Sequence, residues 1–255
     1  MIHALKRTCA AVLAAAILTA TPAVRAGIPE TGWTPDVPAA VDYADRRQGV
    51  ISFAVIDEDG RLRGHRVPST APAASVFKVM LMVAYLRQPS VRHRDLREPD
   101  RDLLTPMIRW SDNAAATRIR DLVGAAAINR LAREADMRDF RLLDPWGLTR
   151  TSPRDQARFM FELKRYIPAR HRDYARRLLA SIVPSQRWGI PKVAPRGWTV
   201  YFKGGWGSGT GKVGHQVAFL ESGDRRIALA IFTESSPSHG YATTTVRGVA
   251  RRLLN

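Results

Sequence analysis

The chain has 255 residues, 45% of them hydrophobic and 25% charged, which is ordinary for a globular protein and argues against a disordered or fibrous one. Its single cysteine, Cys9, excludes a disulfide framework and a metal site built from several cysteines. A formal net charge of +17 points to anionic partners. No basic strand interleaved with aromatic residues accompanies this charge, so we do not expect nucleic acid to be a partner.

The first 26 residues have the order of features of a secretory signal peptide. Lys6 and Arg7 precede a short apolar run over 10–18, and Val24-Arg25-Ala26 then offers small residues for cleavage. The run is too short to cross a bilayer as a helix. We therefore predict cleavage after Ala26 and a secreted, extracytoplasmic, monomeric protein with one domain over 27–255 and no stable membrane span. Anionic cell-wall polymers are natural partners for such a basic exported protein.

The first elements of this domain are predicted from apolar patterns and turn residues. We expect a helix over 37–48 and a β-hairpin over 50–67. From Ser75 onward, an apolar run without Gly or Pro predicts a buried helix. Ser75 at its start is typical of an N-cap, but Lys78 shares its helix face, and the dipole of the helix N-terminus lies close by. The pair alone leaves a structural cap and a nucleophile with its base both open.

The middle of the chain is predicted to be helical, and its end returns to strands. Helices are expected at 102–110, 114–123, 125–135, 153–166 and 169–182, with Ser111-Asp112-Asn113 as a cap and Gly124 as a break. Strands are expected at 199–203, 213–220 and 226–233, with a loop over 204–211 and a final helix over 241–254. Strands from both chain ends would form one five-stranded antiparallel sheet flanked by helices, beside an all-helical region, which is an α+β fold.

Three short motifs follow one another along the chain: Ser75-Val-Phe-Lys78, Ser111-Asp112-Asn113 and Lys203-Gly204-Gly205. Each is weak by itself, because such short patterns occur by chance. Together they match the S-x-x-K, S-D-N and K-T-G set of serine β-lactamases and penicillin-binding proteins. Residues 37–254 therefore resemble a compact member of the class A β-lactamase and D,D-peptidase superfamily. The stretch Thr151–Met160 also resembles the segment that follows this family's omega loop.

The resemblance implies the β-lactamase/transpeptidase-like fold and a catalytic role for five residues. Ser75 would attack a carbonyl carbon and become acylated, with Lys78 as its base. Burial and a nearby cation, Lys203, would lower the pKa of Lys78. Ser111 would relay a proton to the leaving nitrogen, and Asn113 would hold Lys78 and contact the substrate amide. Lys203 would place positive charge near Ser111 and the substrate carboxylate.

The same resemblance implies where substrate binds and of what kind it is. Gly204, Gly205 and Trp206 would line the substrate site, and the backbone N–H groups of Ser75 and Trp206 would form an oxyanion hole. Substrates would be β-lactams or D-Ala-D-Ala-like amides of the peptidoglycan type. We expect no cofactor, and no metal, because the histidines lack the spacing of metal ligands.

The chain departs from the family pattern at two places. No Glu occurs between Glu134 and Glu162, so the shortened omega loop lacks the carboxylate that directs hydrolytic water, and fast β-lactam turnover is not expected. Asp144 is a candidate substitute. Gly204 stands where the family has Ser or Thr, and four residues are candidates to replace that hydroxyl: Ser208, Thr210, Lys212 and His215. These departures and the positive charge leave a second possibility open, a cell-wall-binding protein of the same fold with weak or no turnover.

Overall fold

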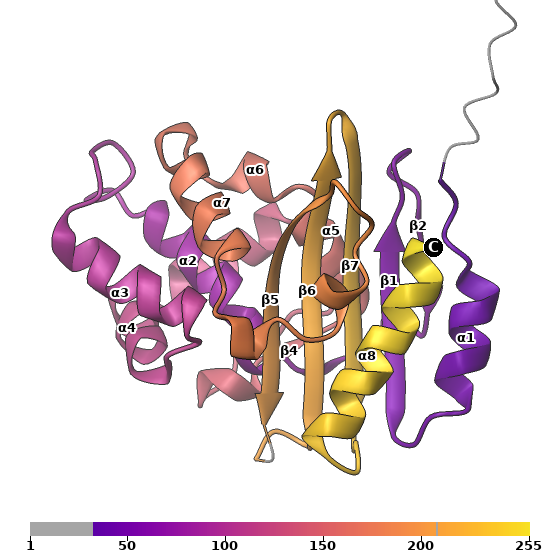
Figure 1. Cartoon of the computed structure of the whole chain (residues 1–255). Coiled ribbons are helices and arrows are strands. Elements are labelled where there is room, and N and C mark those ends of the chain that lie inside the picture. Colours follow the sequence, from indigo (N-terminus) through magenta and orange to yellow (C-terminus); the bar gives the residue numbers. More distant parts are fainter. Residues whose placement is uncertain (1–32, 208) are drawn as a thin grey trace, which may run out of the picture. The chain divides into compact units, whose positions relative to one another are not determined.

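The computed structural model describes residues 33–207 and 209–255, so the predicted signal peptide and its cleavage site lie outside the described residues. A five-stranded antiparallel sheet forms the centre of the described part, in the order β2-β1-β7-β6-β5 (Figure 1). Its strands are β1 (Val50–Ile56), β2 (Leu62–His65), β5 (Thr199–Gly207), β6 (Val213–Ser222) and β7 (Arg225–Glu234). The prediction that strands from both chain ends share one sheet is thereby confirmed.

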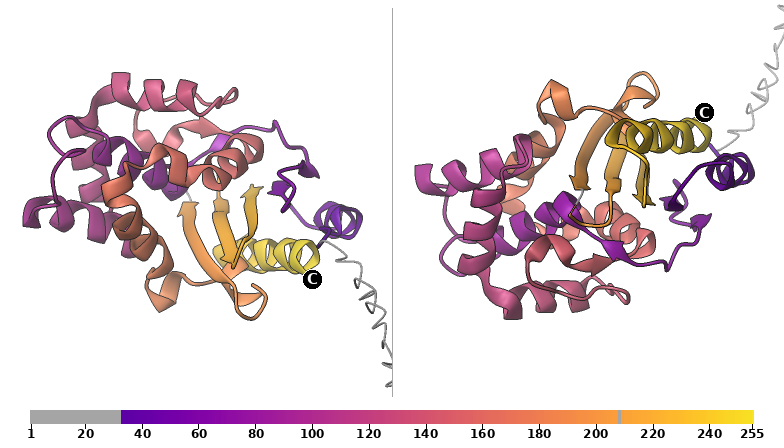
Figure 2. Two further views of the ribbon diagram at one scale, coloured as in Figure 1. Left: turned by 90° about the horizontal axis from the view of Figure 1, so that it is seen from above. Right: turned by 90° about the horizontal axis from the view of Figure 1, so that it is seen from below.

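Helices cover both faces of this sheet, as the two views along it show (Figure 2). The terminal helices α1 (Val37–Asp45) and α8 (His239–Leu254) pack together on one face. The other face carries the helical region, which comprises α2 (Lys78–Leu86), α3 (Glu98–Arg109), α4 (Asn113–Glu134), α5 (Pro153–Phe161), α6 (Leu163–Tyr166) and α7 (Arg172–Ala180). This arrangement confirms the predicted α+β fold. Within the described residues, no helix combines the length and the apolar character needed to cross a bilayer.

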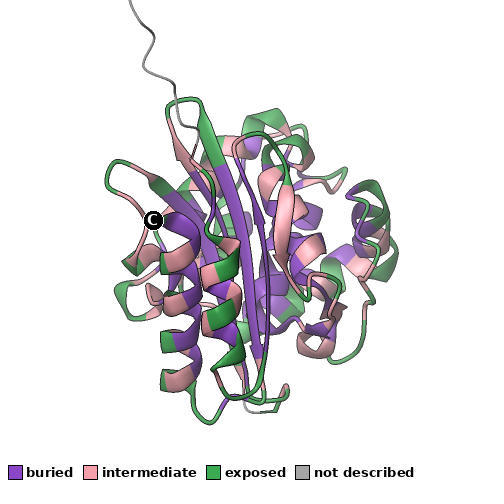
Figure 3. Ribbon diagram, turned by 90° about the vertical axis from the view of Figure 1, so that its right-hand side faces the viewer, coloured by how far each residue is buried: buried purple, intermediate pink, exposed green. Residues whose placement is uncertain are grey.

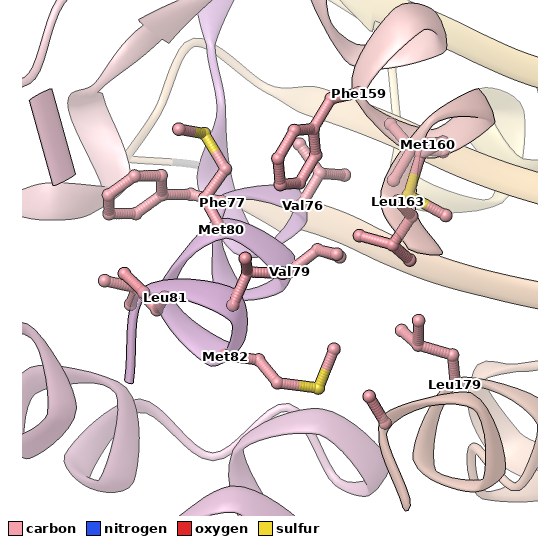
Figure 4. Close-up of a cluster of buried hydrophobic side chains, with 14 of the residues drawn as sticks. Val76, Phe77, Val79, Met80, Leu81, Met82, Phe159, Met160, Leu163 and Leu179 are labelled. Atoms are coloured by element: carbon pink, nitrogen blue, oxygen red, sulfur yellow. The ribbon is translucent and has the colours of Figure 1, made fainter. Parts of the chain in front are cut away.

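The alternation of side chains along each strand divides the core into two clusters. On β1, Phe53 and Val55 face the terminal helices, while Ala54 and Ile56 face the helical region. The strands are therefore mostly buried, whereas the helices present mixed surfaces to solvent (Figure 3). Every residue of α2 is buried, as expected for a helix that is apolar almost all round, and its side chains meet those of α5, α6 and α7 (Figure 4).

The start of α2 differs from the prediction. Residues Ala74–Phe77 form a 3₁₀ turn, η1, and the α-helix begins only at Lys78. Ser75 therefore lies inside the turn, and neither η1 nor α2 has a side-chain cap, which excludes the structural cap among the two roles left open for Ser75. Ala74 takes a positive φ of 45°, a conformation that non-glycine residues adopt only under local constraint.

Other boundaries in the helical region also moved. α3 begins at Glu98 instead of 102, because Pro99 fits a first helical turn and the Asp100 carboxylate accepts the Arg97 N–H at 2.6 Å. The single helix predicted over 153–166 is divided at Glu162 into α5 and α6. A short ladder of β3 (Ala71–Pro72) and β4 (Arg150–Thr151) was not predicted. The break at Gly124 is confirmed, since its φ of 73° and ψ of 158° kink α4.

The predicted end of β5 at Lys203 was wrong, and this matters most for the site. The strand continues to Gly207, with Gly205 opposite His215 and Trp206 opposite Gly214 on β6. Pairing with β6 outweighs the low strand preference of glycine. Because successive residues of a strand face opposite sides of the sheet, Lys203 and Gly205 face the helical region, while Gly204 and Trp206 face the side of α8.

Candidate active site

The end of β5 lies directly against the backbone of η1. A Cβ atom on Gly205 would lie 2.8 Å from the Ser75 nitrogen and 2.9 Å from the Val76 nitrogen, closer than real Cβ contacts. Only glycine permits this approach. The contact brings the backbone of the predicted substrate-binding strand to the N–H groups of the turn that carries Ser75. Two of the three sequence motifs thereby meet.

Ser111 brings its own motif, Ser111-Asp112-Asn113, into contact with the other two. It lies between α3 and α4 with a positive φ of 60°, and its hydroxyl accepts hydrogen bonds from Lys78 Nζ at 3.2 Å and from Lys203 Nζ at 3.0 Å. Lys78 Nζ also donates to the Ser111 carbonyl at 2.5 Å and to Asn113 Oδ1 at 2.7 Å. Lys203 Nζ donates to the Gly204 carbonyl at 2.7 Å. One hydroxyl thus lies between the side-chain nitrogens of two lysines.

Burial makes the charged form of both lysines unfavourable. Desolvation lowers the pKa of Lys78 to about 7, although the carboxylate of Asp112 acts in the opposite direction. Desolvation, together with the charge of Lys78, places the pKa of Lys203 well below its usual value. Asp112 itself is fixed as the N-cap of α4, where its Oδ1 accepts the Ala115 N–H at 2.7 Å. A neutral amine near neutral pH can accept a proton, which the site requires of a base.

The Ser75 side chain is free to react. It is 9% exposed, and no described residue forms a hydrogen bond with its hydroxyl. Lys78, Ser111, Asn113 and Lys203 are joined by hydrogen bonds, and Ser75 lies three residues before Lys78 with its backbone against Gly205. We call these five candidate residues the catalytic cluster.

Trp188 explains why Gly204 has no side chain. A Cβ on Gly204 would lie 3.0 Å from Cζ2 of Trp188, so the indole occupies the space that a Ser or Thr side chain would need. Trp188 also packs edge-on against Trp206 and His239, with ring centroids 6.3 Å and 5.5 Å away. Sequence reasoning missed both Trp188 and His239. The available signal was Gly204, because a glycine where the family has Ser or Thr leaves space for the side chain of another residue.

Two candidates for the missing hydroxyl have other roles in the structure. His215 is fully buried, its Nε2 lies 3.1 Å from the Pro72 carbonyl, and its Nδ1 accepts the Thr233 N–H. Burial lowers the pKa of His215 to about 3, so it is a neutral structural histidine. Thr210 donates its hydroxyl proton to the Gly207 carbonyl within the β5–β6 turn. Ser208 lies outside the described residues, and Lys212 lines a small cavity with Trp206.

An indole stands beside Lys78 on the side of the shortened loop. Trp146 lies on a short 3₁₀ turn, with Lys78 Nζ 5.1 Å from its ring centroid and its Nε1 donating to Thr117 Oγ1 at 3.0 Å. The candidate Asp144 is instead held by Arg120, whose Nη2 lies 2.6 Å from both carboxylate oxygens, and its side chain is 71% exposed. Sequence reasoning missed Trp146, which fills the space next to the amine.

Among the described residues, no group of three or more His, Cys, Asp or Glu side chains is arranged to hold a metal ion. The cluster itself offers two serine hydroxyls, two amines of lowered pKa and backbone N–H groups. This set suits attack on a carbonyl carbon.

Solved structures share this fold over nearly their whole length. A β-lactamase from Sphaerobacter thermophilus is 23% identical, with a TM-score of 0.73 over 85% of this chain and 95% of that one. The protein PBP-A is 20% identical, with a TM-score of 0.71 over 86% of this chain and 94% of that one. An ancestral class A β-lactamase is 18% identical, with a TM-score of 0.72 over 85% and 98%. At these identities the likeness establishes the fold.

The family is established separately, from the sequence. No curated protein sequence is a significant match to this chain. A model of the beta-lactamase enzyme family, however, matches residues 96–255, which include Ser111, Asn113 and Lys203. With more than half of the chain matched and the same fold in the structure, this protein belongs to the beta-lactamase enzyme family, and is a serine hydrolase of β-lactamase type.

Proposed function

We propose that this protein is an exported hydrolase that forms an acyl-enzyme on Ser75 with β-lactams or D-Ala-D-Ala-like amides and releases the acyl group slowly. The domain would span 27–255 after removal of the signal peptide. The observation that carries the proposal is the Ser111 hydroxyl shared by two buried lysines, one of them three residues after Ser75, whose own hydroxyl forms no hydrogen bond with a described residue.

The acylation step uses each member of the catalytic cluster. Neutral Lys78 accepts the proton of Ser75 as the serine oxygen bonds to the carbonyl carbon. Backbone N–H groups at η1 and at the end of β5 stabilise the negative charge on the carbonyl oxygen. As the carbon–nitrogen bond breaks, Ser111 passes its proton to the leaving nitrogen and is reprotonated by the lysine. Lys203 stabilises negative charge on Ser111 and on the substrate carboxylate.

Slow release follows from the groups that surround Lys78. Hydrolysis of the ester needs a base that activates water. The indole of Trp146 occupies one side of the lysine, and Asp144 is bound to Arg120 at the surface. Because Asp144 is held by Arg120 and Asp112 is held as the N-cap of α4, we expect neither carboxylate to activate water, so the acyl-enzyme should accumulate.

Asp144→Asn tests whether this carboxylate takes part in release. Because Asp144 is exposed and paired with Arg120, we expect the lifetime of the acyl-enzyme to change by less than about twofold and acylation to be unaffected. The measurement is the decay of the adduct after excess penicillin is removed, followed by intact mass. Unchanged acylation with no decay of the adduct at all would instead identify Asp144 as the deacylating base.

The proposal as a whole is tested by locating the adduct. The protein is incubated with a fluorescent penicillin, quenched in acid, and examined by intact mass and by tryptic mapping. The peptide expected to carry the label is Val67–Lys78, which contains Ser69, Thr70 and Ser75, and fragmentation distinguishes these three hydroxyls. Protein denatured before incubation is the control and should stay unlabelled.

The outcome also decides between the proposal and its alternative. One equivalent of label on Ser75 with slow loss supports the proposal. Hydrolysis of nitrocefin without a detectable adduct would show rapid release and contradict the slow step. Neither an adduct nor hydrolysis would leave the cell-wall-binding protein of this fold as the better account, with its positive charge directed at anionic polymers.

A further inference from the structure

A cavity lies away from the catalytic cluster, between α5, α6 and α7 and the strands β5, β6 and β7. Its volume is about 440 Å³, in the range of small-molecule sites, and no member of the catalytic cluster lines it. Its apolar wall comprises buried side chains from four elements: Met160, Leu163, Leu179 and Phe219. Met160 and Leu163 lie side by side, with Leu179 across from them (Figure 4).

Cations surround this apolar wall. The lining includes four of them, Lys164, Arg172, Arg176 and Arg226, against the two carboxylates Glu221 and Asp224. One of these carboxylates is already engaged, because Glu221 accepts hydrogen bonds from Arg176 and from the Tyr201 hydroxyl. Arg226 stands with its guanidinium 5.3 Å from the centre of the Phe161 ring. The cavity therefore combines an apolar wall with a lining that carries more cations than carboxylates.

Arg172 is the best-placed of these cations. Its Nε donates to the carbonyls of Lys164 at 3.0 Å and Ile167 at 3.3 Å, which fixes the guanidinium at the C-terminal end of α6. No described residue forms an ion pair with Arg172, so its terminal nitrogens remain available to an anion. A fixed guanidinium can hold a phosphate or a carboxylate through two parallel hydrogen bonds.

A neighbouring cavity shares Arg172 as a wall. This neighbouring cavity has a volume of about 450 Å³ and is lined by Arg172 and three further arginines. Of these three, Arg92 and Arg165 have no ion-pair partner among the described residues, whereas Arg87 is paired with Glu134. An anion bound at Arg172 would thus meet a predominantly positive surface on its outer side, while its remaining body entered the apolar cavity.

We infer that these two cavities form a binding site for an amphiphilic anion, an organic molecule with an apolar body and a phosphate or carboxylate head group. The apolar body lies against Met160, Leu163, Leu179 and Phe219, and the head group binds Arg172. This inference does not depend on acylation of Ser75, because the two sites share no residue.

Calorimetric titration of the full protein with octyl phosphate, below its micelle concentration, tests the site. One equivalent should bind, about tenfold or more tightly than inorganic phosphate, because the alkyl chain becomes buried. Arg172→Gln should weaken binding about tenfold, since a charged hydrogen bond is lost. Arg170→Gln is the matched control, because Arg170 pairs with exposed Asp95 and lines neither cavity, and its effect should stay within about twofold.

Further arms keep the result decisive. Arg226→Gln should also weaken binding and serves if Arg172→Gln fails to fold. If 1-octanol bound as tightly as octyl phosphate, the anionic head group would have no role and the inference would be overturned. If Arg170→Gln weakened binding as much as Arg172→Gln, the effect would reflect the general positive charge of the protein, which would also overturn it. Absence of octyl phosphate binding would overturn the site. Sedimentation with phosphatidylglycerol vesicles then separates the two sources of such a ligand: binding lost in Arg172→Gln assigns a membrane lipid, and no vesicle binding assigns a free molecule.

Discussion

Ser75→Ala is expected to abolish the covalent adduct with penicillin, because the hydroxyl oxygen is the atom that would bond to the acyl carbon. The change removes a single oxygen from a side chain that forms no hydrogen bond among the described residues. The fold should therefore be kept, with the free energy of unfolding changed by less than about 1 kcal/mol. The measurement is fluorescent penicillin labelling alongside thermal unfolding. Label intensity should fall to that of denatured protein, while the unfolding midpoint stays close to that of the wild type.

Ser69→Ala is the matched control for this change. Ser69 lies on the same tryptic peptide but outside η1, and its replacement should leave labelling unchanged. Labelling that persists in Ser75→Ala and disappears in Ser69→Ala would place the nucleophile elsewhere and refute the proposed mechanism. Retained labelling in both variants would point to non-specific acylation of surface groups.

The fold could be predicted largely because its elements are locally specified. The apolar run after Ser75 and the hairpin around Glu58-Asp59-Gly60 each carry a pattern that needs no tertiary information. The end of β5 does not. Gly204, Gly205 and Gly207 disfavour a strand by themselves, and only pairing with β6 and contact with η1 extend it to Gly207.

The site shows the same division. The three motifs predicted which residues would meet, and the structure brings Ser75, Lys78, Ser111 and Lys203 together. The resemblance implied that Asn113 holds Lys78, and Lys78 Nζ does donate to Asn113 Oδ1. The sequence could not predict the further bond from Lys78 to the Ser111 carbonyl, because Ser111 adopts a positive φ. Trp146 and Trp188 were missed for a related reason. An aromatic residue in a loop has no periodic pattern, and its neighbours are decided by tertiary packing.

Lys78→Met is expected to slow acylation of Ser75 by about 10²–10⁴-fold, the usual contribution of a positioned base. Methionine keeps an unbranched apolar stem in the buried space of α2 but has no nitrogen to accept the serine proton. The measurement is the second-order rate constant of penicillin labelling. Lys192→Met is the control, because this lysine is exposed on a separate 3₁₀ turn and should label at the wild-type rate. An unchanged rate in Lys78→Met would assign the base to another group, with Lys203 as the remaining amine at Ser111.

The pH dependence of labelling distinguishes loss of a base from mere distortion. Lys78 must be neutral to accept a proton, so the wild-type rate should rise about tenfold per pH unit below its pKa of about 7 and level off above it. This rise of the labelling rate with pH should disappear in Lys78→Met. Asp112→Asn offers the converse change, since asparagine also caps a helix but no longer raises the pKa of Lys78. Its midpoint should move to lower pH. A midpoint that stays fixed in Asp112→Asn would mean that a group other than Lys78 titrates, because the substitution removes the charge that raises the pKa of Lys78.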